Sequence, residues 1–230
     1  MRVLFVGPSL YGETPDLTGL VVRSPARQGD VARAVLDGAG AIGLVDGFFD
    51  AVAAPWHKEI LFALERGVTM LGASSMGALR AAECAAFGML PIGAIAQDYL
   101  SGALDDDAAV AISHGPEELG YPPLTEPLVN VRPTLDRLRE LGLISDAERT
   151  RIWERAGRLY FKDRSLEALL PADEREELIA AYRKHKVNRK AADALLLVAE
   201  LKTCKAMASV HPTEPEPSFF SRYVLPELMG

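Results

Sequence analysis

The stretch VTMLGASSMGALR, residues 68–80, contains the change from strand to helix that decides the fold of this chain. Its first residues are apolar and end at Gly72, as expected for a buried strand of a parallel sheet. Small residues then form a turn, and helical spacing continues from about Ser75 to Ala86. A buried strand, a tight turn and a helix in this order predict an α/β layer.

The residues before this stretch repeat the same alternation of strand and helix signals. Short apolar runs predict strands, and apolar stripes at helical spacing predict helices between them. The strand runs are residues 3–6, 20–22 and 41–45, and the helical stripes are residues 31–35 and the set Trp56, Ile60, Leu61 and Leu64, which stops at Gly67. We therefore predict an α/β fold, with a mainly parallel sheet flanked by helices over residues 1–125 and a helical C-terminal part after it.

The second half of the chain carries mostly helical signals. Ser145 and Glu148 predict a capping box that starts a helix, because each side chain can bond the backbone amide of the other residue. Further helices are predicted over residues 173–186 and 188–207. The proline-rich tail from Ser209 is expected to be extended.

The composition of the chain excludes several classes of protein. Its 230 residues are 49% hydrophobic and 25% charged, which are globular proportions that allow one sizeable core. A net charge of −7 argues against nucleic-acid binding, and we interpret the dense basic run at residues 183–190 as a solvated helix face. Cys84 and Cys204 form no C-x-x-C pair. No apolar stretch approaches the length of a membrane span, so we expect a soluble, cytoplasmic protein with no membrane partner.

A candidate nucleophile lies in the turn before the helix at residue 75. Ser75 stands in a near match to the strand–nucleophile–helix motif G-x-S-x-G, with Ala73 in place of the first glycine and Gly77 as the second. Small neighbours let a substrate approach such a serine, and amides at the helix start, first that of Met76, can donate to a developing oxyanion. The alternative is structural, because a serine at a helix start is commonly a cap and small residues commonly serve packing.

A serine nucleophile needs a base, and two candidates are adjacent at the start of the preceding helix. Lys58 follows His57 there, and consecutive strand–helix turns of a parallel sheet line the same carboxyl edge. A partly desolvated lysine at a helix N-terminus favours its neutral form, which is the form that accepts a proton. His57 is the competing base, and an ordinary surface position is the alternative interpretation of Lys58.

Further residues that follow strands are expected to line the same edge. Asp46 and Gly47 end the strand before the proposed base, where Asp46 can orient that base and Gly47 can turn a backbone amide towards a ligand. A plain tight turn is the alternative for this pair. Gly7 and Ser9 follow the first strand and are predicted to lie beside them.

The sequence gives no indication of a cofactor. Neither a phosphate loop nor a G-x-G-x-x-G motif follows a strand, which argues against a nucleotide-binding protein. The three aspartates at residues 105–107 offer carboxylates to a divalent cation, but such a run is more often a solvated turn, and we favour that interpretation. We therefore expect no metal and no other cofactor.

Many separated motifs resemble those of the TfuA-like family. The most specific are GASSMGALRAAE at residues 72–83 and FGM at residues 87–89. Others occur in the family's order at residues 7–10, 42–48, 56–61, 105–107, 114–116, 120–121 and 128–132. The resemblance covers about residues 1–145, which we take as a TfuA-like core with a hydrolase-like site, and we take residues 146–230 as a helical C-terminal region.

The resemblance implies a partner of a YcaO enzyme in peptide thioamide formation. TfuA-like proteins are held to release sulfide from a thiocarboxylated sulfur-carrier protein of the ThiS type and to help the YcaO enzyme take up its precursor peptide. The family's serine falls on Ser75 and its lysine on Lys58, while Arg80 and His114 lie in matching motifs as supporting residues. The alternative is a binding module that recruits the carrier and activates YcaO without chemistry of its own.

Overall fold

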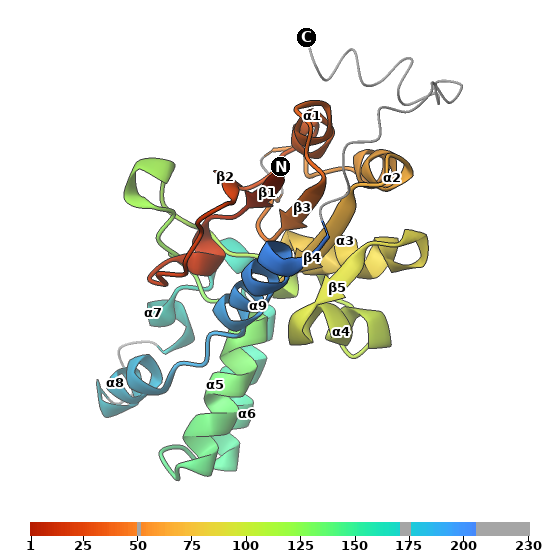
Figure 1. The fold of residues 1–230 in the computed structure, drawn as a ribbon. Coiled ribbons are helices and arrows are strands. Elements are labelled where there is room, and N and C mark those ends of the chain that lie inside the picture. The colour runs from red at the N-terminus through yellow and green to blue at the C-terminus, as the bar shows by residue number, and fades with distance from the viewer. Residues whose placement is uncertain (50–51, 171–175, 206–230) are drawn as a thin grey trace. The chain divides into compact units, whose positions relative to one another are not determined.

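The computed structural model describes residues 1–49, 52–170 and 176–205 of the chain. It contains a sheet in which every pair of neighbouring strands is parallel, in the order β2-β1-β3-β4-β5 (Figure 1). The strands are β1 (Arg2–Phe5), β2 (Val21–Arg23), β3 (Ala41–Leu44), β4 (Thr69–Ala73) and β5 (Leu90–Ile92). The predicted parallel sheet is therefore confirmed. The proline-rich tail lies outside the described residues.

The helices follow the strands as an α/β fold requires, and a helical part comes after them, as predicted. The α-helices are α1 (Asp30–Leu36), α2 (His57–Glu65), α3 (Met76–Cys84), α4 (Gly93–Ser101), α5 (Leu128–Glu140), α6 (Asp146–Arg158), α7 (Leu166–Leu169), α8 (Glu176–His185) and α9 (Arg189–Thr203). Short 3-10 helices lie at Pro8–Leu10, Ala85–Phe87, Asp107–Ala109, Glu117–Leu119 and Phe161–Asp163. Among the described residues, no helix is long and apolar enough to cross a membrane.

Strand β5 was not predicted, because it contains Pro91. A proline removes a backbone N–H donor, so it normally argues against a strand. β5 pairs with β4 alone at the edge of the sheet, with Pro91 opposite Gly72, and an edge strand tolerates a proline because one of its sides has no partner to bond.

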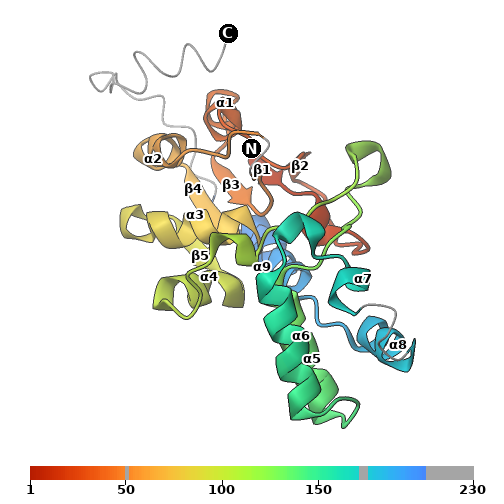
Figure 2. The ribbon, with the colours of Figure 1, turned by 180° about the vertical axis from the view of Figure 1, so that it is seen from behind.

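Helices cover both faces of the sheet (Figures 1 and 2). α1, α2 and α3 share one core cluster with the side chains of β1, β3 and β4. α9 packs on the opposite face, although 87 residues lie between the end of α4 at Ser101 and its own start at Arg189. Gly43 in β3 permits this approach, because a Cβ there would lie 2.6 Å from Leu197 of α9.

Glu59 is a buried carboxylate that ties α2 to α1. It is 0% exposed, and it accepts hydrogen bonds from the first amides of α1, those of Gly29, Val31 and Ala32, at 3.1 to 3.3 Å. It also accepts from the Trp56 amide at 2.7 Å. Burial raises the pKa of the Glu59 carboxyl, and the backbone donors oppose that rise. Trp56, which the apolar stripe placed in this helix with Ile60, instead precedes the first turn of α2 and is 41% exposed.

The chain divides into two compact units. The first contains Met1–Asp105 and the described residues from Ala191 onwards, and the second is Asp106–Lys190. In the second unit the Glu148 amide donates to Ser145 Oγ at 3.2 Å and the Ser145 amide donates to Glu148 Oε2 at 2.9 Å, which confirms the capping box of α6. The division predicted at residue 145 marks the end of the family resemblance, which is a different boundary from that between these two compact units.

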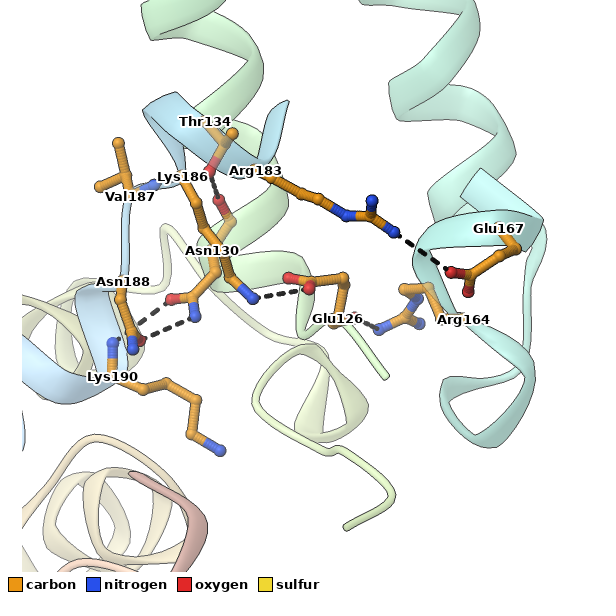
Figure 3. A network of polar contacts seen from close by, with 10 residues as sticks. All are labelled: Glu126, Asn130, Thr134, Arg164, Glu167, Arg183, Lys186, Val187, Asn188 and Lys190. Atoms are coloured by element: carbon orange, nitrogen blue, oxygen red, sulfur yellow. Dashed lines mark hydrogen bonds and ion pairs between the residues drawn. The ribbon is translucent and has the colours of Figure 1, made fainter. Parts of the chain in front are cut away.

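A network of polar contacts occupies the second unit (Figure 3). Asn130 of α5 donates from Nδ2 to Asn188 Oδ1 at 3.0 Å and accepts from the Lys190 amide at 3.3 Å. Lys186 Nζ lies 2.6 Å from Glu126 Oε1. These contacts connect α5 with the segment between α8 and α9.

The same contacts correct the interpretation of the basic run at residues 183–190. The run is not one solvated helix face, because α8 ends at His185 and α9 begins at Arg189. Lys190 is 3% exposed and its ammonium donates to the Val110 carbonyl at 2.8 Å. Because the chain changes direction between α8 and α9, Lys184 is exposed whereas Lys190 is buried.

Candidate functional site

The loops that follow β1, β3 and β4 meet at the carboxyl edge of the sheet. The strand order 2-1-3-4-5 is that of flavodoxin-like doubly wound sheets, in which ligands bind where β1 and β3 diverge. Ser9 follows β1, Asp46 follows β3 and Ser74 follows β4, and hydrogen bonds join the three side chains. The predicted edge residues Gly7, Ser9 and Asp46 are therefore neighbours.

Asp46 holds the loop after β1. Its carboxylate is 2% exposed and accepts from the Gly7 amide at 2.9 Å, the Ser9 amide at 3.0 Å and Ser9 Oγ at 2.7 Å. These amides would face an anion in a phosphate loop, but here a side chain of the same chain occupies them. Asp46 therefore fixes the backbone of the loop that carries Gly7 and Ser9.

The turn between β4 and α3 is tight and strained. The Ser75 amide donates to the Ala73 carbonyl at 2.8 Å, and Ser74 between them has φ of +68°. A bond from residue i to i+2 around a positive φ defines the rare γ-turn form that costs conformational free energy. Ser74 Oγ donates to Ser9 Oγ at 2.9 Å. Ser74 has no signature of its own in the sequence, because the G-x-S-x-G motif places its serine at residue 75.

Ser75 occupies the N-cap position of α3, yet its side chain makes no capping hydrogen bond. It is 8% exposed, whereas Ser74 is 0% exposed. Of the nearby amides, that of Ser75 is used in the γ-turn and that of Gly77 donates to the Val45 carbonyl at 3.1 Å. The Met76 amide has no acceptor within the described part of the chain. It is the amide that remains to stabilise an oxyanion beside Ser75.

The predicted site glycines serve close packing. A Cβ at Gly77 would lie 1.7 Å from the Leu44 carbonyl oxygen, so α3 approaches the end of β3 through this residue. A Cβ at Gly47 would lie 2.8 Å from Met76 Cγ. Gly47 therefore lies against the Met76 side chain, beside the candidate oxyanion donor.

The candidate bases lie in the first turn of α2. His57 Nε2 is 2.8 Å from Glu83 Oε2, and Arg80 donates to the same carboxylate at 2.6 Å and to the Pro55 carbonyl at 2.9 Å. Glu83 comes eight residues after Ser75, so at 1.5 Å per residue it lies about 12 Å farther along the axis of α3. His57 and Arg80 thus belong to a surface cluster at the last turn of α3.

Lys58 follows His57 in the same turn and is exposed, so the expectation that its amine is partly desolvated is wrong. An exposed position in the first turn of α2 does not by itself bring the Lys58 amine to Ser75. The Ser75–Lys58 pair therefore stays a prediction.

The remaining candidates lie near the start of the second unit. Residues 105–107 are exposed, and Asp106 accepts from the Ala108 amide at 2.8 Å, as in a solvated turn. Within the described residues, no group of three histidine, cysteine or acidic side chains is placed to hold a metal ion. His114 has Nδ1 2.8 Å from the Gly115 carbonyl oxygen, and its ring meets that of Tyr121 edge-on with centroids 5.4 Å apart.

Comparison with known families decides the relationship of this chain. The family model for TfuA-like proteins matches residues 46–165, a little more than half of the sequence. The chain belongs to the TfuA-like family. No curated protein sequence matches it. The matched region of this TfuA-like protein contains Asp46, Lys58, Ser74 and Ser75, whereas Ser9 precedes it. Membership in the family points to a role beside a YcaO enzyme in thioamide biosynthesis.

Proposed function

We propose that this TfuA-like protein hydrolyses a thiocarboxylated sulfur carrier of the ThiS type, releases sulfide for its YcaO partner and helps that enzyme engage its peptide. The observation that carries the proposal is the geometry at the start of α3. Ser75 follows a strained turn at the carboxyl edge of the sheet, makes no capping bond, and precedes the open amide of Met76. These are the features that an acyl-transfer site needs, a serine nucleophile with an oxyanion donor next to it.

The reaction follows ordinary acyl chemistry. Ser75 Oγ attacks the carbonyl carbon of the thiocarboxylate, and the amine of Lys58 takes the serine proton. A tetrahedral intermediate forms, and the Met76 amide donates to its oxyanion. The C–S bond breaks, sulfide leaves with the proton from Lys58, and water then hydrolyses the ester on Ser75. The balance is one thiocarboxylate and one water giving one carboxylate and one hydrogen sulfide, so no oxidant or reductant is required.

The second candidate function is a binding module that recruits the carrier and activates YcaO, with Ser75 acting as a helix cap. The lack of a capping bond from Ser75 argues against that role for the serine. The buried packing around Gly77 favours it, because the small residues there have a structural use.

Sulfide release from a purified thiocarboxylated carrier separates the two functions. We expect Ser75→Ala to lower the rate at least about 100-fold while the carrier still binds, since a nucleophile is lost and the surface is kept. Full sulfide release by Ser75→Ala would support the binding module.

Replacing the neighbouring residues of α2 identifies the base. Lys58→Met keeps the methylene bulk and removes the amine, so we expect no sulfide release and intact folding. His57→Gln keeps a donor near Glu83 and should retain most of the activity. If Lys58 is the base, the wild-type rate should also rise with pH, and a flat profile would argue against it. The reverse pattern, with His57→Gln inactive and Lys58→Met active, would move the base to histidine.

A further inference from the structure

Ser74 adopts a backbone conformation in which glycine is the ordinary choice. Ten glycines in the described part of the chain have a positive φ, whereas Ser74 and Tyr121 are the residues with side chains that do so there. A side chain at positive φ is uncommon because its Cβ crowds the backbone, and glycine avoids that cost. A serine at this position therefore needs a reason that lies in its hydroxyl group.

The hydroxyl of Ser74 begins a buried chain of hydrogen bonds. Ser74 Oγ donates to Ser9 Oγ at 2.9 Å, and Ser9 Oγ donates to Asp46 Oδ1 at 2.7 Å. The three residues are 0%, 2% and 2% exposed, and each follows a different strand. The chain of bonds thus connects the ends of β1, β3 and β4 beneath the turn that carries Ser75.

The chemistry of the three groups fixes the direction of every bond. An ionised carboxylate only accepts, so Ser9 must give its single hydroxyl proton to Asp46. Ser9 Oγ can then only accept from Ser74, and the Ser74 proton is committed in turn. The other oxygen of Asp46 is bound by the Gly7 and Ser9 amides, which prevents the carboxylate from rotating away. Ser74 is therefore held in one rotamer by partners that cannot exchange roles.

We propose that Ser74 is a positioning residue that, through Ser9 and Asp46, holds the γ-turn in the conformation that presents Ser75 and leaves the Met76 amide open. Ser74 is fully enclosed, so it acts on a substrate only through its neighbour. The effect on the γ-turn stands on the contacts themselves. The effect on sulfide release rests on the proposed function.

Two variants break the chain of bonds at different places. Ser74→Gly removes the hydroxyl and introduces a residue that adopts a positive φ without strain, so the substitution should not lower the stability of the fold through backbone strain. Ser9→Ala removes the acceptor for Ser74 and leaves the turn sequence unchanged. Ser101→Ala is the matched control, because Ser101 Oγ is exposed and donates to a carbonyl of its own helix, that of Asp98.

The first measurement is hydrogen exchange of the Ser75 amide, which is bonded to the Ala73 carbonyl across the turn. We expect exchange to become about tenfold faster or more in both Ser74→Gly and Ser9→Ala, with no change in Ser101→Ala and none at the Ile42 amide in the core. An unchanged Ser75 amide in both variants would overturn the proposal. Faster exchange in Ser74→Gly alone would also overturn it, since the cause would then be the flexibility of glycine.

The second measurement is the kinetics of sulfide release. We expect the same two variants to lower kcat about tenfold or more with KM nearly unchanged, because a misplaced nucleophile affects the reaction step and not carrier binding. An unchanged kcat in both would overturn the catalytic part of the proposal. If the wild-type chain releases no sulfide, the proposed function fails, and the exchange measurement still decides whether Ser74 holds the turn.

Discussion

Asp46 in the first unit and Glu126 in the second are both buried carboxylates, but they are satisfied to different degrees. Asp46 accepts from two backbone amides and one serine hydroxyl. Glu126 is 9% exposed; its Oε1 binds Lys186, and its Oε2 has no hydrogen-bond partner among the described residues (Figure 3). A fully bonded buried carboxylate fixes its surroundings in one arrangement, whereas an unbonded buried oxygen costs free energy.

The kind of partner also differs between the two carboxylates. The amides that donate to Asp46 belong to a short loop that contains the 3-10 helix Pro8–Leu10. Glu59 is likewise bound by backbone amides. The donor to Glu126 is a flexible lysine side chain that is 33% exposed. The first unit thus holds its carboxylates rigidly where the candidate site lies, and the second relies on an ion pair that water reaches.

Replacing Asp46 by alanine should give the largest loss of stability. The Gly7 and Ser9 amides and the Ser9 hydroxyl lose their acceptor, and each buried unpaired donor costs about 1–3 kcal/mol. We expect the free energy of unfolding, measured with urea, to fall by about 3 kcal/mol or more. In Asp46→Asn the amide oxygen can still accept from both backbone amides while its NH₂ donates to Ser9, so about half that loss is expected. Equal losses in the two variants would show that charge, and not the number of bonds, matters here.

Removing Lys186 tests the less satisfied carboxylate. Lys186→Met leaves Glu126 buried without its charged partner, and we expect a loss of about 2 kcal/mol, below the range for fully enclosed ion pairs because the lysine is partly solvated. Lys184→Met, in the last turn of α8 just before Lys186, changes an exposed cation and should stay within about 0.5 kcal/mol of the wild type. The double variant Lys186→Met/Glu126→Gln should recover most of the loss. No recovery would mean that Lys186 stabilises the unit through its methylene stem.

The sequence predicted the parts of this comparison that have local signatures. Apolar runs closed by a glycine or by Asp46-Gly47 located β1, β3 and β4, and the residues after them were expected to share one edge of the sheet. The sequence therefore predicted that Gly7, Ser9 and Asp46 lie together, and hydrogen bonds join them in the structure. Whether Lys58 reaches Ser75 depends on the stagger of α2 against α3, which no local pattern determines.

The features that escaped prediction depend on contacts between distant residues. Ser74 needs Ser9, 65 residues earlier, to hold its turn, and Glu59 caps a helix that begins 29 residues before it. A tryptophan precedes α2 where a serine or threonine normally marks a capping box, and an indole cannot accept a hydrogen bond. The bond from the Trp56 amide to the Glu59 carboxylate therefore had no recognisable pattern. Helix α9 was expected from its spacing, but its partner on the sheet depends on Gly43.

Tyr182 provides the smallest expected effect in the comparison. It is 0% exposed in α8, and its hydroxyl has no hydrogen-bond partner among the described residues. Burial raises the pKa of the Tyr182 phenol well above its ordinary value, and the charge of Glu126 raises it further. The phenol is therefore neutral at every ordinary pH, and its hydroxyl is a buried donor that adds little to stability.

Tyr182→Phe removes this hydroxyl and keeps the ring. We expect the free energy of unfolding to stay the same or to rise by up to about 1 kcal/mol, because a desolvated and unbonded hydroxyl no longer has to be buried. Tyr160→Phe, at a ring that is 51% exposed, is the control and should change stability by no more than about 0.5 kcal/mol. A loss above about 1 kcal/mol in Tyr182→Phe would show that the hydroxyl bonds a buried water shared with Glu126. Glu126 would then be as fully satisfied as Asp46, and the contrast between the two units would reduce to the identity of the donors.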